Sequence, residues 1–112
     1  MEKLVLLIPS ETMGRGDERL GQILIRSFCH VLTGITPQPD TIIFLNSGVK
    51  LVIGASPVLA DLQALAAQGV ELLACGTCLG HYDLKDQVAV GEVSNMYTIA
   101  ETLLRAGKVI TL

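Results

Sequence analysis

The sequence predicts an α/β protein, a three-layer α/β/α sandwich around a mostly parallel five-stranded sheet. Short apolar runs alternate along the chain with amphipathic segments of helical length. The runs are apolar at successive positions, which is typical of strands that are covered on both faces. The 112 residues are close to the usual size of one domain, so residues 1–112 are treated as a single domain.

The five predicted strands are short and bounded by turn-forming residues. Pro9 ends the first, Asn46-Ser47-Gly48 follows the second, and the fourth rests on three apolar residues alone. The predicted strands are residues 3–8, 41–45, 70–74, 88–90 and 108–112.

Three longer helices are predicted from capping residues at their starts and glycines at their ends. A proline at the first helical position, Pro57, strengthens the second start. Residues 49–53 fit either a strand or a helical turn, and we favour a short helix. The predicted caps and stops are Asp17 and Gly34, Ser56 and Gly69, and Ser94 or Asn95 and Gly107.

Composition indicates a homo-oligomer that has neither the membrane nor nucleic acid as its partner. Half of the residues are apolar and 17% are charged, yet no apolar run approaches the ~20 residues that span a bilayer. We therefore expect apolar surface to be buried between copies of the chain. The net charge of −3, with no cluster of Lys and Arg, argues against nucleic acid.

The cysteines and the amino-terminal residues predict a cytoplasmic location. The first apolar run is too short for a signal peptide and lacks a cleavage site. Three cysteines, an odd number, do not resemble the disulfide framework of a secreted protein. We expect thiols that stay reduced and reactive.

The strongest functional feature is the C-x-x-C pair formed by Cys75 and Cys78, directly after the predicted strand 70–74. A thiol reacts as its thiolate, and backbone N–H groups at a strand-to-helix turn can stabilise that anion. The alternative is that Cys75 is a small apolar core residue. The pair, with Gly76 and Thr77 between, favours a reactive site.

Other polar residues are expected near the thiols, because ligand sites gather at the carboxyl ends of parallel strands. His81 and Tyr82 lie a few residues beyond the pair. Each is a candidate for a general acid, a general base or a gate at the thiol site. Loops after the other strands supply further candidates for lining a pocket. These candidates are Arg15, Asn46, Ser47, Gly48, Ser94 and Asn95.

Several site classes fit the sequence less well. Cys75, Cys78 and His81 would leave a zinc ion one ligand short, so no metal site is predicted. The thioredoxin family needs a later cis-proline, and no proline follows Pro57. The glycines of residues 13–17 lack a complete phosphate-binding pattern, so no cofactor is predicted. The sequence remains consistent with a redox-active or sulfur-carrying dithiol.

Four segments, read together, resemble the DsrE-like family of small sulfur-handling proteins. They are Gly14-Arg-Gly-Asp17, the run from Phe44 to Leu51, Ala74-Cys-Gly-Thr-Cys-Leu79, and the run from Val90 to Tyr97. Within the family the chain looks most like the C-terminal domain of YedF-type proteins, which are described as sulfurtransferase-like and linked to selenium metabolism. Those proteins usually carry an N-terminal TusA-like domain, so this chain is a stand-alone homologue or an excised domain.

The resemblance implies a function for the two thiols. In related members a cysteine after the third strand carries persulfide sulfur between partner proteins, and Cys75 matches that position, with Cys78 as the added thiol. Cys75 would then hold the sulfur and Cys78 would resolve it. It also implies a trimer or hexamer, and sulfur donor and acceptor proteins such as a TusA-like domain.

Two functions are consistent with these residues. The first is a cysteine-based persulfide carrier in sulfur or selenium metabolism. The second is a non-catalytic oligomeric module that binds a small ligand or a partner protein, with structural cysteines and zinc as one option. Whether the transferred element is sulfur or selenium stays open.

Overall fold

The computed structural model describes residues 2–112 and confirms the predicted fold class. Five parallel strands form one sheet in the order β4-β3-β2-β1-β5. The strands are β1 (Leu4–Ile8), β2 (Thr41–Phe44), β3 (Glu71–Cys75), β4 (Glu92–Ser94) and β5 (Lys108–Thr111).

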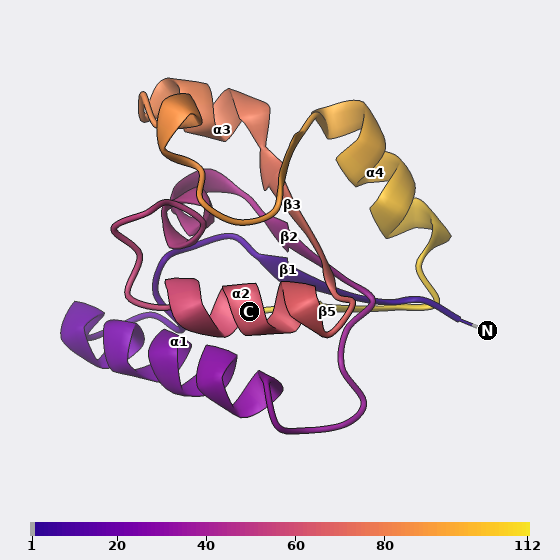
Figure 1. The fold of residues 1–112 in the computed structure, drawn as a ribbon, viewed down its shortest axis with the longest axis horizontal. Coiled ribbons are helices and arrows are strands. Elements are labelled where there is room, and N and C mark those ends of the chain that lie inside the picture. The colour runs from indigo at the N-terminus through magenta and orange to yellow at the C-terminus, as the bar shows by residue number, and fades with distance from the viewer. Residues whose placement is uncertain (1) are drawn as a thin grey trace.

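Helices cover the sheet on both faces, which gives the three predicted layers. α1 and α2 lie on one face and α4 lies on the other, while α3 stands at the end of β3 (Figure 1). Within residues 2–112, none of the helices has both the length and the hydropathy to cross a membrane. The helices are α1 (Glu18–Leu32), α2 (Leu59–Ala67), α3 (Gly76–His81), α4 (Met96–Arg105) and the 3-10 turns η1 (Asn46–Leu51) and η2 (Lys85–Gln87).

The strand register explains why the three central strands, β1, β2 and β3, are largely apolar. Residues paired across parallel strands point to the same face, and neighbouring residues along a strand point to opposite faces. One row, Leu6, Ile42 and Leu72, faces α1 and α2, and the next row, Leu7, Ile43 and Leu73, faces α4. Both rows are largely buried, so each face of the sheet needs apolar side chains.

Two of the predicted helix starts are confirmed in atomic detail. The Asp17 carboxylate accepts a hydrogen bond from the Leu20 N–H at 2.8 Å and caps α1. Asn95, one of the two predicted caps for the last helix, accepts one from the Thr98 N–H at 2.9 Å.

The predicted fourth strand at residues 88–90 is wrong, because pairing with β3 starts four residues later. Val88 instead forms an isolated antiparallel bridge with Ile53. Gly91 then turns the chain with a φ of 78° and lies directly on β3, where a Cβ atom would come within 2.8 Å of the Leu72 carbonyl oxygen. The chain therefore joins the sheet after this glycine, at Glu92.

Other boundaries also differ from the predictions. α2 begins at Leu59 and not at Pro57, because the Ser56 hydroxyl accepts a hydrogen bond from the Val58 N–H at 3.2 Å and closes a turn there. The short helix favoured at residues 49–53 exists, but as η1 it already begins at Asn46. β3 extends through Cys75, whose partner in β4 is Ser94.

Gly48 allows η1 to pack directly on the end of β1. A Cβ atom at this position would collide with the carbonyl oxygen of Ile8. That oxygen already accepts a hydrogen bond from the Leu45 N–H at 3.1 Å, so it has little room to move. Gly48, predicted to line a pocket, is buried and has this packing role instead.

We expect Gly48→Ala to lower the free energy of unfolding by about 1–3 kcal/mol, because the added methyl group must push η1 away from β1. Urea denaturation measures this. Gly34→Ala is the matched control: nothing lies within 4 Å of the added Cβ, and we expect a change under about 0.5 kcal/mol. Equal effects of the two substitutions would contradict the packing role.

Candidate functional site

The two thiols at the carboxyl edge of the sheet differ in accessibility. Cys75 is the last residue of β3, and its side chain is 1% exposed. Cys78 lies in the first turn of α3 and is only partly buried. Both are free thiols. Cys78 is therefore the thiol that a reagent or a partner protein can reach without a change in structure.

Cys78 lines a groove of about 300 Å³. The other residues that line it are Asn46, Thr77, His81 and Tyr82. They come from η1, which follows β2, and from α3, which follows β3. Because β2 and β3 are neighbours in the sheet, the segments that leave their carboxyl ends meet here.

The Cys78 sulfur accepts a hydrogen bond from a backbone amide. The Asn46 N–H lies 3.1 Å from Cys78 Sγ. Asn46 has a φ of 51°, in the left-handed region that asparagine tolerates better than most residues. The amide that we expected from the turn at the cysteines thus comes from the start of η1.

A network of side chains surrounds this amide. The Tyr82 hydroxyl donates a hydrogen bond to Asn46 Oδ1 at 3.0 Å, and the Ser47 N–H donates to the same oxygen at 2.8 Å. The Lys50 ammonium lies 4.6 Å from the centre of the Tyr82 ring, within the range of a cation–π interaction. The His81 ring packs edge-on against Tyr82, with 5.1 Å between ring centres.

Burial dominates the ionisation of Cys78. It raises the pKa of the thiol above the ordinary 9.0, and the neighbouring Cys75 side chain raises it further. The Asn46 amide lowers the same pKa but does not outweigh burial. Cys78 is therefore mostly protonated at neutral pH, and its reactivity should increase with pH as the thiolate forms.

The structure brings together some predicted site residues and separates others. Asn46, His81 and Tyr82 share the groove with Cys78. The Ser47 hydroxyl instead accepts a hydrogen bond from the Glu11 N–H at 3.2 Å and so faces the 9–17 loop.

Arg15, Ser94 and Asn95 lie outside the residues that line the groove. Arg15 is exposed in the 9–17 loop. Ser94 lies beside Cys75 in the sheet, and the Asn95 side chain is occupied as the cap of α4. Their predicted role in lining one pocket with Cys78 is not supported.

Sequence reasoning missed Thr77 and Lys50. Thr77 stands between the two cysteines, so its position beside the groove could have been inferred from the motif. Lys50 lies four residues after Asn46, a spacing that would have pointed to it only if η1 had been recognised as starting at Asn46. Cys29 is buried in the core, where burial raises its pKa to about 12, and it stays a thiol.

The residues of a possible zinc site do not assemble. Within residues 2–112, no group of three or more His, Cys, Asp and Glu side chains lies close enough together to hold a metal ion. Cys75, Cys78 and His81 therefore do not form a ready ligand set.

Fold and site define a small parallel α/β protein with two thiols at the carboxyl edge of its sheet. Residues 16–112 match the model of the DsrE/DsrF-like family. The match covers most of the chain, which therefore belongs to the DsrE/DsrF-like family. Among curated proteins no similar sequence was found.

Solved structures show the same fold at low sequence identity. The ychN protein from E. coli has a TM-score of 0.74 and 20% identity, with all of both chains covered. MTH1491, a protein of unknown function from Methanobacterium thermoautotrophicum, has a TM-score of 0.69 and 19% identity, again with all of both chains covered. BT1422 from Bacteroides thetaiotaomicron, also of unknown function, has a TM-score of 0.69 and 14% identity, with 98% of this chain and 95% of that chain covered.

We expect Cys78 to be alkylated first when the folded, reduced protein is treated with limiting iodoacetamide. Cys75 and Cys29 should react only after unfolding, because both are buried. The rate at Cys78 should rise with pH up to and beyond 9.0, since its pKa is raised above that value. Peptide mass mapping across a pH series measures both. Labelling of Cys75 before Cys78 would contradict the assigned accessibilities.

Proposed function

We propose that the chain is a cysteine-based carrier of persulfide sulfur, acting in the cytoplasm in sulfur or selenium metabolism. The observation that carries the proposal is the accessible thiol of Cys78, with a backbone amide on its sulfur, beside the buried thiol of Cys75. Membership in the DsrE/DsrF-like family, whose members are often linked to sulfur relay, supports it. A closer relation to YedF-type proteins is part of the same proposal.

Burial argues for exchanging the roles that the resemblance implied for the two cysteines. A donor persulfide on another protein cannot approach a side chain that is 1% exposed, so Cys75 is a poor first nucleophile. Cys78 would load instead. Its thiolate attacks the outer sulfur of the donor, R–S–SH, forming Cys78–S–SH and releasing the donor thiolate R–S⁻.

Two routes unload the carrier. An acceptor thiolate can attack the outer sulfur, taking it as a new persulfide and restoring the Cys78 thiolate with no net oxidation. Alternatively, the Cys75 thiolate attacks Cys78 Sγ, forming a disulfide and releasing hydrosulfide, HS⁻. The second route reduces the carried sulfur, oxidises the dithiol, and needs an external thiol to reset it.

Sulfur donor and acceptor proteins, with a TusA-like domain as one candidate, complete this proposal. The groove beside Cys78 is open to a partner's cysteine, and His81 is exposed at its rim. His81 is suited to take up or supply the proton that moves with each transfer.

Homo-oligomerisation, as a trimer or hexamer, is also proposed. Two helices cover one face of the sheet, whereas among residues 2–112 the other face has one long helix, α4, which packs mainly on β3 (Figure 1). By register Val109 lies on this second face, and it is exposed. Apolar surface left open in this way is typical of an interface.

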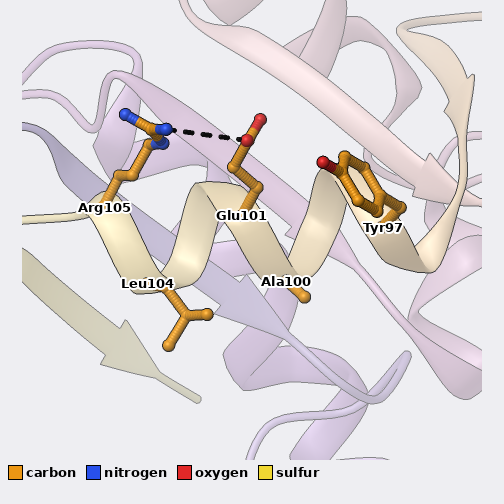
Figure 2. Close-up of a pocket in the computed structure, with 5 residues that line it drawn as sticks. All are labelled: Tyr97, Ala100, Glu101, Leu104 and Arg105. Atoms are coloured by element: carbon orange, nitrogen blue, oxygen red, sulfur yellow. Dashed lines mark ion pairs between the residues drawn. The ribbon is translucent and has the colours of Figure 1, made fainter.

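The outer side of α4 adds to this surface. Figure 2 shows the groove formed there by Tyr97, Ala100, Glu101, Leu104 and Arg105, in which Glu101 and Arg105 form an ion pair of 3.7 Å. Leu104 is 86% exposed and Tyr97 79%. An exposed leucine beside an exposed aromatic ring is a suitable anchor for a second copy of the chain.

One observation favours a second function, a non-catalytic oligomeric module that binds a small ligand or a partner protein. The raised pKa of Cys78 leaves little thiolate at neutral pH, which suits a structural thiol better than one that must react at that pH. The groove volume of about 300 Å³ is at the lower end of small-molecule sites.

We expect the reduced protein, incubated with glutathione persulfide, to gain the mass of one sulfur atom on Cys78. Cys75→Ser should keep this adduct, whereas the wild type should lose it over time, release hydrosulfide and acquire the Cys75–Cys78 disulfide. Cys78→Ser should form no adduct. Intact-protein and peptide mass spectrometry distinguish these species.

Two results would contradict this scheme. An adduct on Cys75 in Cys78→Ser would restore the roles implied by the resemblance. A wild-type protein that forms no adduct would favour the binding module.

We expect Leu104→Glu to lower the mass of the assembly, because it places a charge in the proposed interface. Light scattering after size-exclusion chromatography measures this mass. Arg105→Gln is the control on the same groove, since it breaks the Glu101 ion pair without adding a charge to the apolar surface. A wild-type monomer, or a Leu104→Glu protein of unchanged mass, would exclude this side of α4 as the interface.

A further inference from the structure

We propose that Tyr82 is a positioning residue that holds the Asn46 amide on the sulfur of Cys78. The inference rests on the proposed function only for its biological purpose, since the contacts concern the reactivity of the free thiol. Three hydrogen bonds link Tyr82, Asn46 and Cys78 in a closed ring.

The first link fixes Tyr82 relative to the thiol. Tyr82 follows Cys78 by one helical turn, and its N–H donates a hydrogen bond to the Cys78 carbonyl oxygen at 3.2 Å. The ring is half-buried, with the Lys50 ammonium 4.6 Å from its centre and the His81 ring nearly perpendicular to it at 5.1 Å between centres. The Tyr82 hydroxyl therefore has a defined position.

The second link fixes Asn46. This residue is exposed, so packing does little to hold its left-handed conformation, which is unfavourable for a residue with a side chain. Two hydrogen bonds to Oδ1 hold it instead, one from the Ser47 N–H at 2.8 Å and one from the Tyr82 hydroxyl at 3.0 Å. The Ser47 bond is local, so the Tyr82 bond is the one that ties Asn46 to α3.

The third link is the functional one. The Asn46 N–H donates to Cys78 Sγ at 3.1 Å. A hydrogen bond to the charged form favours that form, so this amide stabilises the thiolate against the opposing effect of burial. Removing the Tyr82 hydroxyl should free Asn46 to turn away and weaken this stabilisation, while the tyrosine ring stays packed.

The test is the pH profile of Cys78 alkylation in the full chain. We expect Tyr82→Phe to shift the midpoint upward by about half a unit, which corresponds to about threefold slower alkylation below the midpoint. Thr33→Val is the control, because it also removes one hydroxyl, which donates to the His30 carbonyl oxygen at the end of α1, and Thr33 does not line the groove of Cys78. The proposal is overturned if Tyr82→Phe shifts the profile no more than Thr33→Val does.

A double-mutant cycle with Asn46→Gly tests whether Tyr82 acts through Asn46. Glycine keeps the N–H and tolerates the φ of 51°, but it lacks the oxygen that Tyr82 contacts. We expect Asn46→Gly alone to shift the profile in the same direction as Tyr82→Phe, and Tyr82→Phe to add nothing further in the Asn46→Gly protein. A full second shift in the double mutant would overturn the proposal.

The result is independent of the persulfide experiment. If the protein forms no persulfide adduct but Tyr82→Phe shifts the alkylation profile, the carrier function fails and the positioning role stands. If the adduct forms and the profile does not move, the carrier function stands and the positioning role fails.

Discussion

The packing of η1 on the end of β1 is the constraint on which the thiol site depends. Because Gly48 has no side chain, η1 can approach the Ile8 carbonyl oxygen directly. This approach fixes where η1 begins, and Asn46 is its first residue. The sheet order then places the end of β3 next to the end of β2, so α3 brings Cys78 up to the Asn46 amide. The hydrogen bond from the Asn46 N–H to Cys78 Sγ thus depends on the contact of Gly48 with the end of β1, one strand further away.

The two thiols differ in burial: Cys78 is accessible, whereas Cys75 is enclosed in the sheet. In the sheet Cys75 completes the pairing of β3 with β4, whereas Cys78 leaves the sheet with α3. Burial keeps the pKa of Cys78 high and the Asn46 amide moderates the rise. Since a thiol of lower pKa is also a weaker nucleophile, this balance favours a thiolate that is scarce but strongly reactive.

Much of the fold was predictable from the sequence, because continuous apolar runs and capping residues are local signals. The site was predictable to the level of the sheet edge and the C-x-x-C pair. The sequence offered the burial of Cys75 only as an alternative, because it depends on whether β3 ends before or after that residue. The true position of β4 depends on the close contact of Gly91 with Leu72, which no local pattern records. Ser47 and Asn95 looked free to line a pocket, but each side chain is occupied by a nearby backbone amide.

The order of burial in the C-x-x-C pair also affects what oxidants can do to the protein. Peroxide would meet Cys78 first and convert it to a sulfenic acid, while Cys75 stays shielded in the sheet. A sulfenic acid condenses with a neighbouring thiol, so Cys75 could trap it as a disulfide before irreversible oxidation to the sulfinic acid. A disulfide can be reduced again by cellular thiols. The buried cysteine would then protect the accessible one from permanent damage, whether or not a sulfur atom is ever carried.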